Sequence, residues 1–314
     1  MRGRGGRGAA RSRAARAGRA RLGAALMGAA GLAVAACGAS SAPPGVGVRP
    51  SGHPSPRPSA SLVPRPRHTV VVIFENHPYG DVIGNPRARY LNALARSGAL
   101  FTASYAVSHP SEPNYLALFS GSTHGVTSDQ CPTSLHAPNL AADLLANGLS
   151  FVGYSEGLPS AGSQVCQRGN YARKHVPWTD FTGLPRGLSQ PFTRFAAGGF
   201  RTLPAVSFVI PDLCHDMHDC PVSTGDAWLR AHLAGYAQWA QTHDSLLIVT
   251  FDEDDGGNAN HIATIFAGQH VRPGRYRVSV DHYNVLRTIE QAYGLPFRGE
   301  ARTHYPITSI WRRS

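Results

Sequence analysis

Short, almost purely apolar runs alternate along the chain with segments whose apolar residues recur at helical spacing. Runs of the first kind are typical of strands that are buried on both faces of a sheet. We predict strands over residues 68–75, 99–107, 149–155, 205–211, 245–251 and 261–268. We predict helices over residues 87–97, 114–120, 140–146, 226–241 and 281–293. This alternation indicates an α/β fold with a mostly parallel sheet covered by helices on both faces.

The first 67 residues differ from the rest in charge. They contain 12 of the 30 Lys and Arg residues and no acid, since the first carboxylate is Glu75. That leaves 18 basic residues against 19 acidic ones in the remainder. The formal net charge of +11 therefore belongs to the N-terminal region, and the folded part is close to neutral. Because the folded part carries no basic excess, we predict no nucleic-acid partner.

The N-terminus has the pattern of an export signal. An Arg-rich start precedes the apolar stretch 22–36, which is too short to span a bilayer comfortably. Small residues before Cys37 predict a lipoprotein-type signal over residues 1–36, with lipid on Cys37 at the outer face of a membrane. Ordinary cleavage near Ala33-Val34-Ala35 and release of a secreted protein is the alternative. Residues 37–67, rich in Pro, Ser and Gly, predict a disordered tether to one domain at 68–314.

The cysteine count agrees with export. Setting Cys37 aside leaves an even number of cysteines, and disulfides are expected in an exported domain. Three pairings are possible, and we favour Cys131–Cys166 with Cys214–Cys220. A zinc site is the weaker interpretation, because the sequence contains no C-x-x-C pair.

Polar side chains follow the predicted strands where each one ends. They form the clusters 75–77, 109–111, 212–219, 252–257 and 281–282, which contain carboxylates, histidines and Ser111. Because the carboxyl ends of parallel strands share one edge of a sheet, we expect these clusters to lie close together. Carboxylates around a hydroxyl are typical of a hydrolase assisted by a hard divalent cation.

Ser111 stands on a proline-bounded turn just before a predicted helix. A helix N-terminus receives anions such as phosphate, so a serine held there can act as a nucleophile. The structural alternatives are that Ser111 only caps the helix and that residues 252–257 form a solvated loop or an incidental Ca²⁺-binding turn. Five such clusters at strand ends favour the catalytic interpretation.

These residues also carry a family resemblance. The sequence resembles the bacterial acid phosphatase and phospholipase C-type phosphoesterase family of the alkaline phosphatase superfamily, and within it the SapM-type secreted phosphatidylinositol-3-phosphatases. The resemblance implies an α/β/α sandwich and a phosphoserine intermediate. It rests on the segments 74–85, 108–129, 171–178, 216–229, 245–256 and 281–296.

The resemblance also implies roles for individual residues. One divalent cation (Ca²⁺, Mg²⁺, Mn²⁺ or Zn²⁺) is expected on Glu75, Asn76, Ser111, Asp252 and Glu253. Ser111 is expected to attack phosphorus, and His218 and Asp216 to bind phosphate or protonate the leaving oxygen. Substrate contacts are expected from His109, Asn114, Lys174, His175 and His282.

Together these observations predict an exported, monomeric acid phosphatase. Its substrates would be phosphate monoesters, either small molecules or phospholipid headgroups such as that of phosphatidylinositol 3-phosphate. A phospholipase C-type phosphodiesterase is the alternative within the same fold, because fold does not fix the substrate. A non-catalytic ligand-binding lipoprotein is the remote alternative.

Overall fold

The computed structural model describes residues 62–257 and 259–312. The predicted signal peptide and nearly all of the predicted tether lie outside these ranges, so their boundaries stay predictions. Within the described ranges, no helix combines the length and apolar character needed to cross a membrane.

A nine-stranded mixed sheet forms the centre of the fold. Its strand order is β10-β2-β9-β8-β1-β7-β3-β6, and β11 also pairs with β2. The strands are β1 (His68–Phe74), β2 (Ala99–Tyr105), β3 (Phe151–Ser155), β6 (Ser189–Pro191), β7 (Val206–Ile210), β8 (Ser245–Phe251), β9 (His261–Gly268), β10 (Gly274–Tyr276) and β11 (Val280–Asp281). A separate hairpin joins β4 (Gln167–Arg168) to β5 (Tyr171–Ala172).

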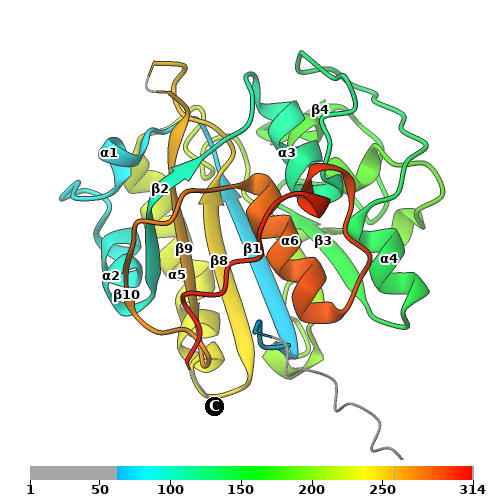
Figure 1. Ribbon diagram of the computed structural model, residues 1–314. Coiled ribbons are helices and arrows are strands. Elements are labelled where there is room, and N and C mark those ends of the chain that lie inside the picture. Colours follow the sequence, from blue (N-terminus) through cyan, green and yellow to red (C-terminus); the bar gives the residue numbers. More distant parts are fainter. Residues whose placement is uncertain (1–61, 258, 313–314) are drawn as a thin grey trace, which may run out of the picture. The chain divides into compact units, whose positions relative to one another are not determined.

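Helices cover both faces of this sheet, and Figure 1 shows α6 in front of it and α5 behind. Alternate residues of β1 enter two separate cores: Val71 and Ile73 face one, while Val70 and Val72 face the other. The first core includes α3, α4 and α6, and the second includes α2 and α5. The helices are α1 (Tyr79–Val82), α2 (Arg89–Ser97), α3 (Ser111–Ser120), α4 (Leu140–Ala146), α5 (Val222–Ala240) and α6 (His282–Tyr293). The predicted α/β/α sandwich is confirmed.

The sheet is mostly parallel, as predicted, with one exception inside it. Strand β9 runs antiparallel to both of its neighbours, β2 and β8. Only residues 252–260 separate Phe251 from His261, fewer than the roughly dozen residues that a crossover to a parallel strand needs. The remaining strands around β1 are parallel, so the carboxyl ends of β1, β3, β7 and β8 share one edge.

Two disulfides brace loops that follow strands of this sheet. Cys131 pairs with Cys166, and Cys214 pairs with Cys220, which is the favoured pairing. The second disulfide closes the loop between β7 and α5, which contains Asp216 and His218. That loop therefore has little freedom to leave the carboxyl edge.

Glu290 on α6 gives a test of stability that is independent of the site. Its side chain is fully buried; Oε1 accepts the Arg298 N–H at 3.0 Å, while Oε2 has no partner among the described residues. Burial raises the pKa of Glu290 to about 8, so folding favours the protonated acid. Its stabilising contribution is complete below the unfolded-state pKa and is lost as pH rises toward 8.

Glu290→Gln should therefore become more stable relative to the wild type as pH rises from 5 to 8. The expected slope is at most about 1.4 kcal/mol per pH unit. Urea unfolding at several pH values measures this slope. Glu300→Gln, a change at an exposed residue, is the control. Parallel pH profiles for Glu290→Gln and the wild type would contradict the assignment.

Candidate active site

Ser111 lies at the centre of the carboxyl edge. It is the first residue of α3 and its side chain is buried. Its Oγ lies 2.9 Å from Glu75 Oε2 and 3.0 Å from Glu253 Oε1. A hydroxyl donates one hydrogen, so either carboxylate can accept it at any moment. The arrangement places a nucleophilic oxygen between two proton acceptors.

Neighbouring strands bring the acidic residues together. Strands β1 and β8 are parallel, and their last paired residues are Phe74 and Phe251. The residues that follow these two strands therefore start from adjacent positions at one edge of the sheet. Glu75 follows β1, and Asp252 follows β8. The chain turns at Asn76, whose φ of 50° lies in the left-handed region that asparagine tolerates. Its N–H then donates to Asp252 Oδ1 at 3.1 Å.

The carboxyl groups of this cluster are costly to ionise in the protein alone. Burial, followed by the charges of Asp252 and Asp216, raises the pKa of Glu75 well above its usual value. Burial and the neighbouring Glu253 raise the pKa of Asp252 to about 7. Burial also raises the pKa of Glu253. A positive charge bound among these groups would reverse these shifts.

The donor set fits a divalent cation. Asn76 Oδ1 and Asp252 Oδ2 are buried and have no hydrogen-bond partner within the part of the chain that the structure describes. Native proteins seldom leave buried oxygens unpaired unless water or an ion binds them. These two oxygens, with the oxygens of Glu75, Ser111 and Glu253, form an all-oxygen set that hard cations prefer.

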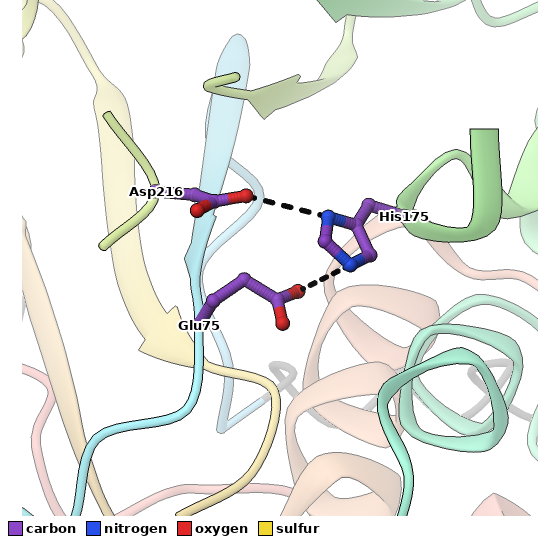
Figure 2. A group of neighbouring side chains, drawn as sticks. All are labelled: Glu75, His175 and Asp216. Atoms are coloured by element: carbon purple, nitrogen blue, oxygen red, sulfur yellow. Dashed lines mark ion pairs between the residues drawn. The ribbon is translucent and has the colours of Figure 1, made fainter. Parts of the chain in front are cut away.

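His175 lies behind this cluster rather than at its surface. Its side chain is buried, with Nε2 3.3 Å from Glu75 Oε1 and Nδ1 3.3 Å from Asp216 Oδ2, as Figure 2 shows. The Tyr115 hydroxyl also donates to Glu75 Oε1, and its ring stacks on the His175 ring. Burial lowers the pKa of His175 well below its usual value. These contacts favour a positioning role for His175 over the expected substrate contact.

Asp216 and His218 sit on the disulfide-closed loop with different exposure. Asp216 is buried; its Oδ1 accepts the His218 N–H at 2.8 Å and its Oδ2 faces His175. Its place favours a role in holding the His175 ring and the backbone at His218 over contact with a substrate. The half-buried His218 ring lies 2.7 Å from Asp219 through Nδ1, and its centroid is 6.0 Å from that of His175. His218 therefore suits proton transfer better than Asp216 does.

Lys174, Asp129 and His109 form a second polar group that is linked to the surroundings of Ser111. Lys174 Nζ lies 2.6 Å from Asp129 Oδ2, and Asp129 Oδ1 accepts the Glu112 N–H at 3.0 Å. Burial lowers the pKa of Lys174, but the hydrogen bond and charge of Asp129 outweigh it and raise the pKa overall. His109 is partly exposed and contacts Glu253 through Nδ1. Lys174 is thus linked through Asp129 to the first turn of α3, and His109 contacts a carboxylate that lies beside Ser111 Oγ.

Asn114 and His282, both expected to contact substrate, instead contact the backbone. The Asn114 amide accepts from Val107 N and Ser108 N and donates to Ser108 O and Pro110 O. All of its usual hydrogen-bonding capacity therefore holds the loop before Ser111. His282 Nε2 lies 2.6 Å from the Asp252 carbonyl oxygen and the ring is buried. These contacts favour a positioning role for both residues, and the predicted substrate contacts stay predictions.

Sequence reasoning missed two contributors. Tyr115 follows Ser111 by four residues, so helical spacing puts both on one face of α3, and that signal could have found it. Asn260 connects the two catalytic loops: its Nδ2 donates to Ser108 O at 2.7 Å, and its Oδ1 accepts the Asp254 N–H at 2.9 Å. Asn260 directly precedes the predicted strand 261–268 and does not directly follow one, so reasoning from strand ends does not select it.

Comparisons with known proteins show the family of the chain. Residues 81–296 match the model of the Phosphoesterase family. A phosphatidylinositol-3-phosphatase of Mycobacterium tuberculosis is 51% identical over 255 residues, covering 81% of this chain and 85% of that protein. An acid phosphatase of Aspergillus fumigatus is 30% identical over 252 residues, covering 73% of this chain. The match spans only 55% of that fungal protein.

A solved structure supports the fold. A protein in the alkaline phosphatase superfamily from Vibrio parahaemolyticus matches with a TM-score of 0.53 and 14% sequence identity. The match covers 77% of this chain and 71% of that one. At this identity the likeness concerns the fold alone.

Proposed function

The chain belongs to the phosphoesterase family and is a phosphoric ester hydrolase, and from this premise we propose that it hydrolyses phosphate monoesters through a phosphoserine on Ser111. The observation that carries the proposal is the buried Ser111 hydroxyl at the N-terminus of α3, held within 3.0 Å of two carboxylates. A serine that only caps a helix does not require two carboxylates next to its hydroxyl group.

The chain's own groups account for both halves of the reaction. Ser111 Oγ attacks phosphorus as its proton passes to a contacting oxygen of Glu75 or Glu253. The Ser111 N–H at the start of α3 stabilises the charge that spreads over the phosphoryl oxygens, since the Glu112 N–H is bonded to Asp129 and Pro113 has no N–H. His218 protonates the departing alkoxide, and water then hydrolyses the phosphoserine. Lys174 and His109 hold the phosphoryl group.

We propose that Glu75, Asn76, Ser111, Asp252 and Glu253 hold one divalent cation. Bound there, the cation would lower the pKa of the Ser111 hydroxyl and neutralise phosphoryl charge. Its identity among Ca²⁺, Mg²⁺, Mn²⁺ and Zn²⁺ is a matter for titration with each metal after treatment with chelator.

The named activity of the 51% identical relative supports phosphatidylinositol 3-phosphate as one substrate. The acid phosphatase relative supports a wider range of monoesters. Two disulfides support an exported protein, since such bonds persist in oxidising compartments. Whether Cys37 carries lipid or the protein is released is decided by labelling cells with radioactive palmitate.

A substrate comparison tests the proposal. Purified protein is assayed with p-nitrophenyl phosphate and with p-nitrophenyl phosphorylcholine, each with chelator and with each cation. We expect cation-dependent hydrolysis of the monoester and little of the diester. Faster cleavage of the diester would assign the phospholipase C-type activity instead. No turnover of either compound would favour the non-catalytic binding protein.

A further inference from the structure

An aromatic groove lies beside the catalytic edge and has no part in the proposed chemistry. Its volume is about 730 Å³, within the range of sites that bind small molecules. It lies between the residues after β3, the segment after β6 and one side of α5. The apolar part of its lining comes from Leu158, Pro191, Phe192, Phe195, Phe200 and Ala231.

We propose that this groove binds one acyl chain of a phospholipid monoester while its headgroup phosphate occupies the catalytic edge. The inference rests on the proposed phosphatase function and adds the determinant of its lipid specificity. Three observations carry it: the continuity of the groove with the catalytic loop, its rigid aromatic walls, and the charge of its surroundings.

Continuity comes from Glu156, which lines the groove and directly follows β3. Glu156 Oε2 accepts the Asp212 N–H at 3.1 Å and lies 2.9 Å from His215 Nδ1. The Asp212 carbonyl in turn accepts the Asp216 N–H at 2.7 Å. The groove therefore begins one loop away from Asp216 and His218.

Rigid walls come from ring packing against α5. Phe192 stacks on Phe195 with centroids 5.5 Å apart and contacts Trp228 at 5.0 Å. Phe200 packs edge-on against Tyr236 at 5.5 Å. Because each ring packs against α5 on its inner side, its position is fixed. The outer sides of the rings are half-buried and keep the shape of the groove. Such a surface gains free energy when a methylene chain covers it.

The charge around the groove complements an anionic lipid. From Gly157 to Pro211 the only acid is Asp180, which is buried. The same stretch exposes four arginines, of which Arg168 lines the groove while Arg186 and Arg201 line other cavities. The Glu156 carboxylate at the lip is paired with His215. A phosphodiester between headgroup and acyl chains would therefore meet arginine rather than carboxylate.

The test compares two water-soluble phosphatidylinositol 3-phosphates, the dibutanoyl and the dioctanoyl forms, below their micelle concentrations. Released phosphate gives kcat/KM for each. We expect the dioctanoyl form to be better by roughly tenfold or more, because more methylene groups are buried. Ala231→Trp, at an exposed groove position on α5, should bring the ratio toward one. Ala234→Trp, on the same helix but outside the groove, should keep the wild-type ratio.

A ratio near one in the wild type overturns the proposal, and so does a wild-type ratio in folded Ala231→Trp. If the enzyme prefers longer chains only when the lipid is in vesicles, the aromatic segment contacts the bilayer surface. That result also overturns the proposal. If p-nitrophenyl phosphate is hydrolysed while the ratio is one, only the groove assignment fails. If no monoester is hydrolysed, the proposed function fails as well. Melting temperatures show whether each variant folds. If Ala231→Trp does not fold, the ratio of the two kcat/KM values in the wild type decides the proposal.

Discussion

Ser111→Ala should lower kcat for phosphate monoesters by about 10⁴-fold or more, as is typical when a nucleophile is removed. Ser111 supplies the only hydroxyl found between the Glu75 and Glu253 carboxylates in the described residues. Alanine removes the attacking oxygen and leaves the first turn of α3 and its N–H groups in place. Phosphate should therefore still bind the variant while turnover is lost. Steady-state assays and phosphate titration measure the two effects separately.

Acid quenching gives a direct readout of the intermediate. The wild type should retain labelled phosphate on the peptide that contains Ser111, and Ser111→Ala should retain none. Ser108→Ala is the matched control, because the Ser108 hydroxyl bonds to the His109 carbonyl rather than to a carboxylate. Turnover by Ser111→Ala at the wild-type rate would mean that water attacks phosphorus directly, and the phosphoserine mechanism would be abandoned.

The elements that the sequence could predict are those with a strong apolar period. The runs at Ser245–Phe251 and His261–Gly268 were placed at the right bounds, because both strands are buried on both faces. Direction was harder to predict, since the antiparallel course of β9 depends on a short turn rather than on its own residues. The sequence does not predict β6 and β10, because three residues are too few to show a repeating pattern of apolar positions.

The candidate site shows a similar division. Strand ends predicted the cluster of Glu75, Ser111 and Glu253, because residues after parallel strands must share an edge. The burial of each side chain in the site could not be predicted. The family resemblance predicts substrate contacts for His175 and Asn114, and the structure adds that both side chains are buried. Which polar residue faces substrate and which supports it depends on packing that a strand-end pattern does not encode.

Asp252→Asn should have opposite effects on stability without and with the cation. Burial and Glu253 raise the pKa of Asp252 to about 7, so in chelator its contribution to stability is lost as pH rises from about 4 through 7. Asparagine carries no charge to desolvate, so the variant should be more stable than the wild type in chelator at pH 8. With a cation present the order should reverse, because a ligand that binds the folded state stabilises it by an amount that rises with the logarithm of the affinity.

Calorimetric titration measures the affinity itself. Loss of the Asp252 carboxylate should weaken cation binding by more than the roughly 10- to 100-fold typical of residues that only support a ligand. Turnover should fall at low cation concentration and recover partly at high concentration. Asp255→Asn is the matched control from the same acidic run, since Asp255 is exposed and accepts only a local N–H from Gly257. Equal cation affinity in Asp252→Asn and the wild type would remove Asp252 from the ligand set, and its unpaired, buried Oδ2 would then require water or a contact with the substrate.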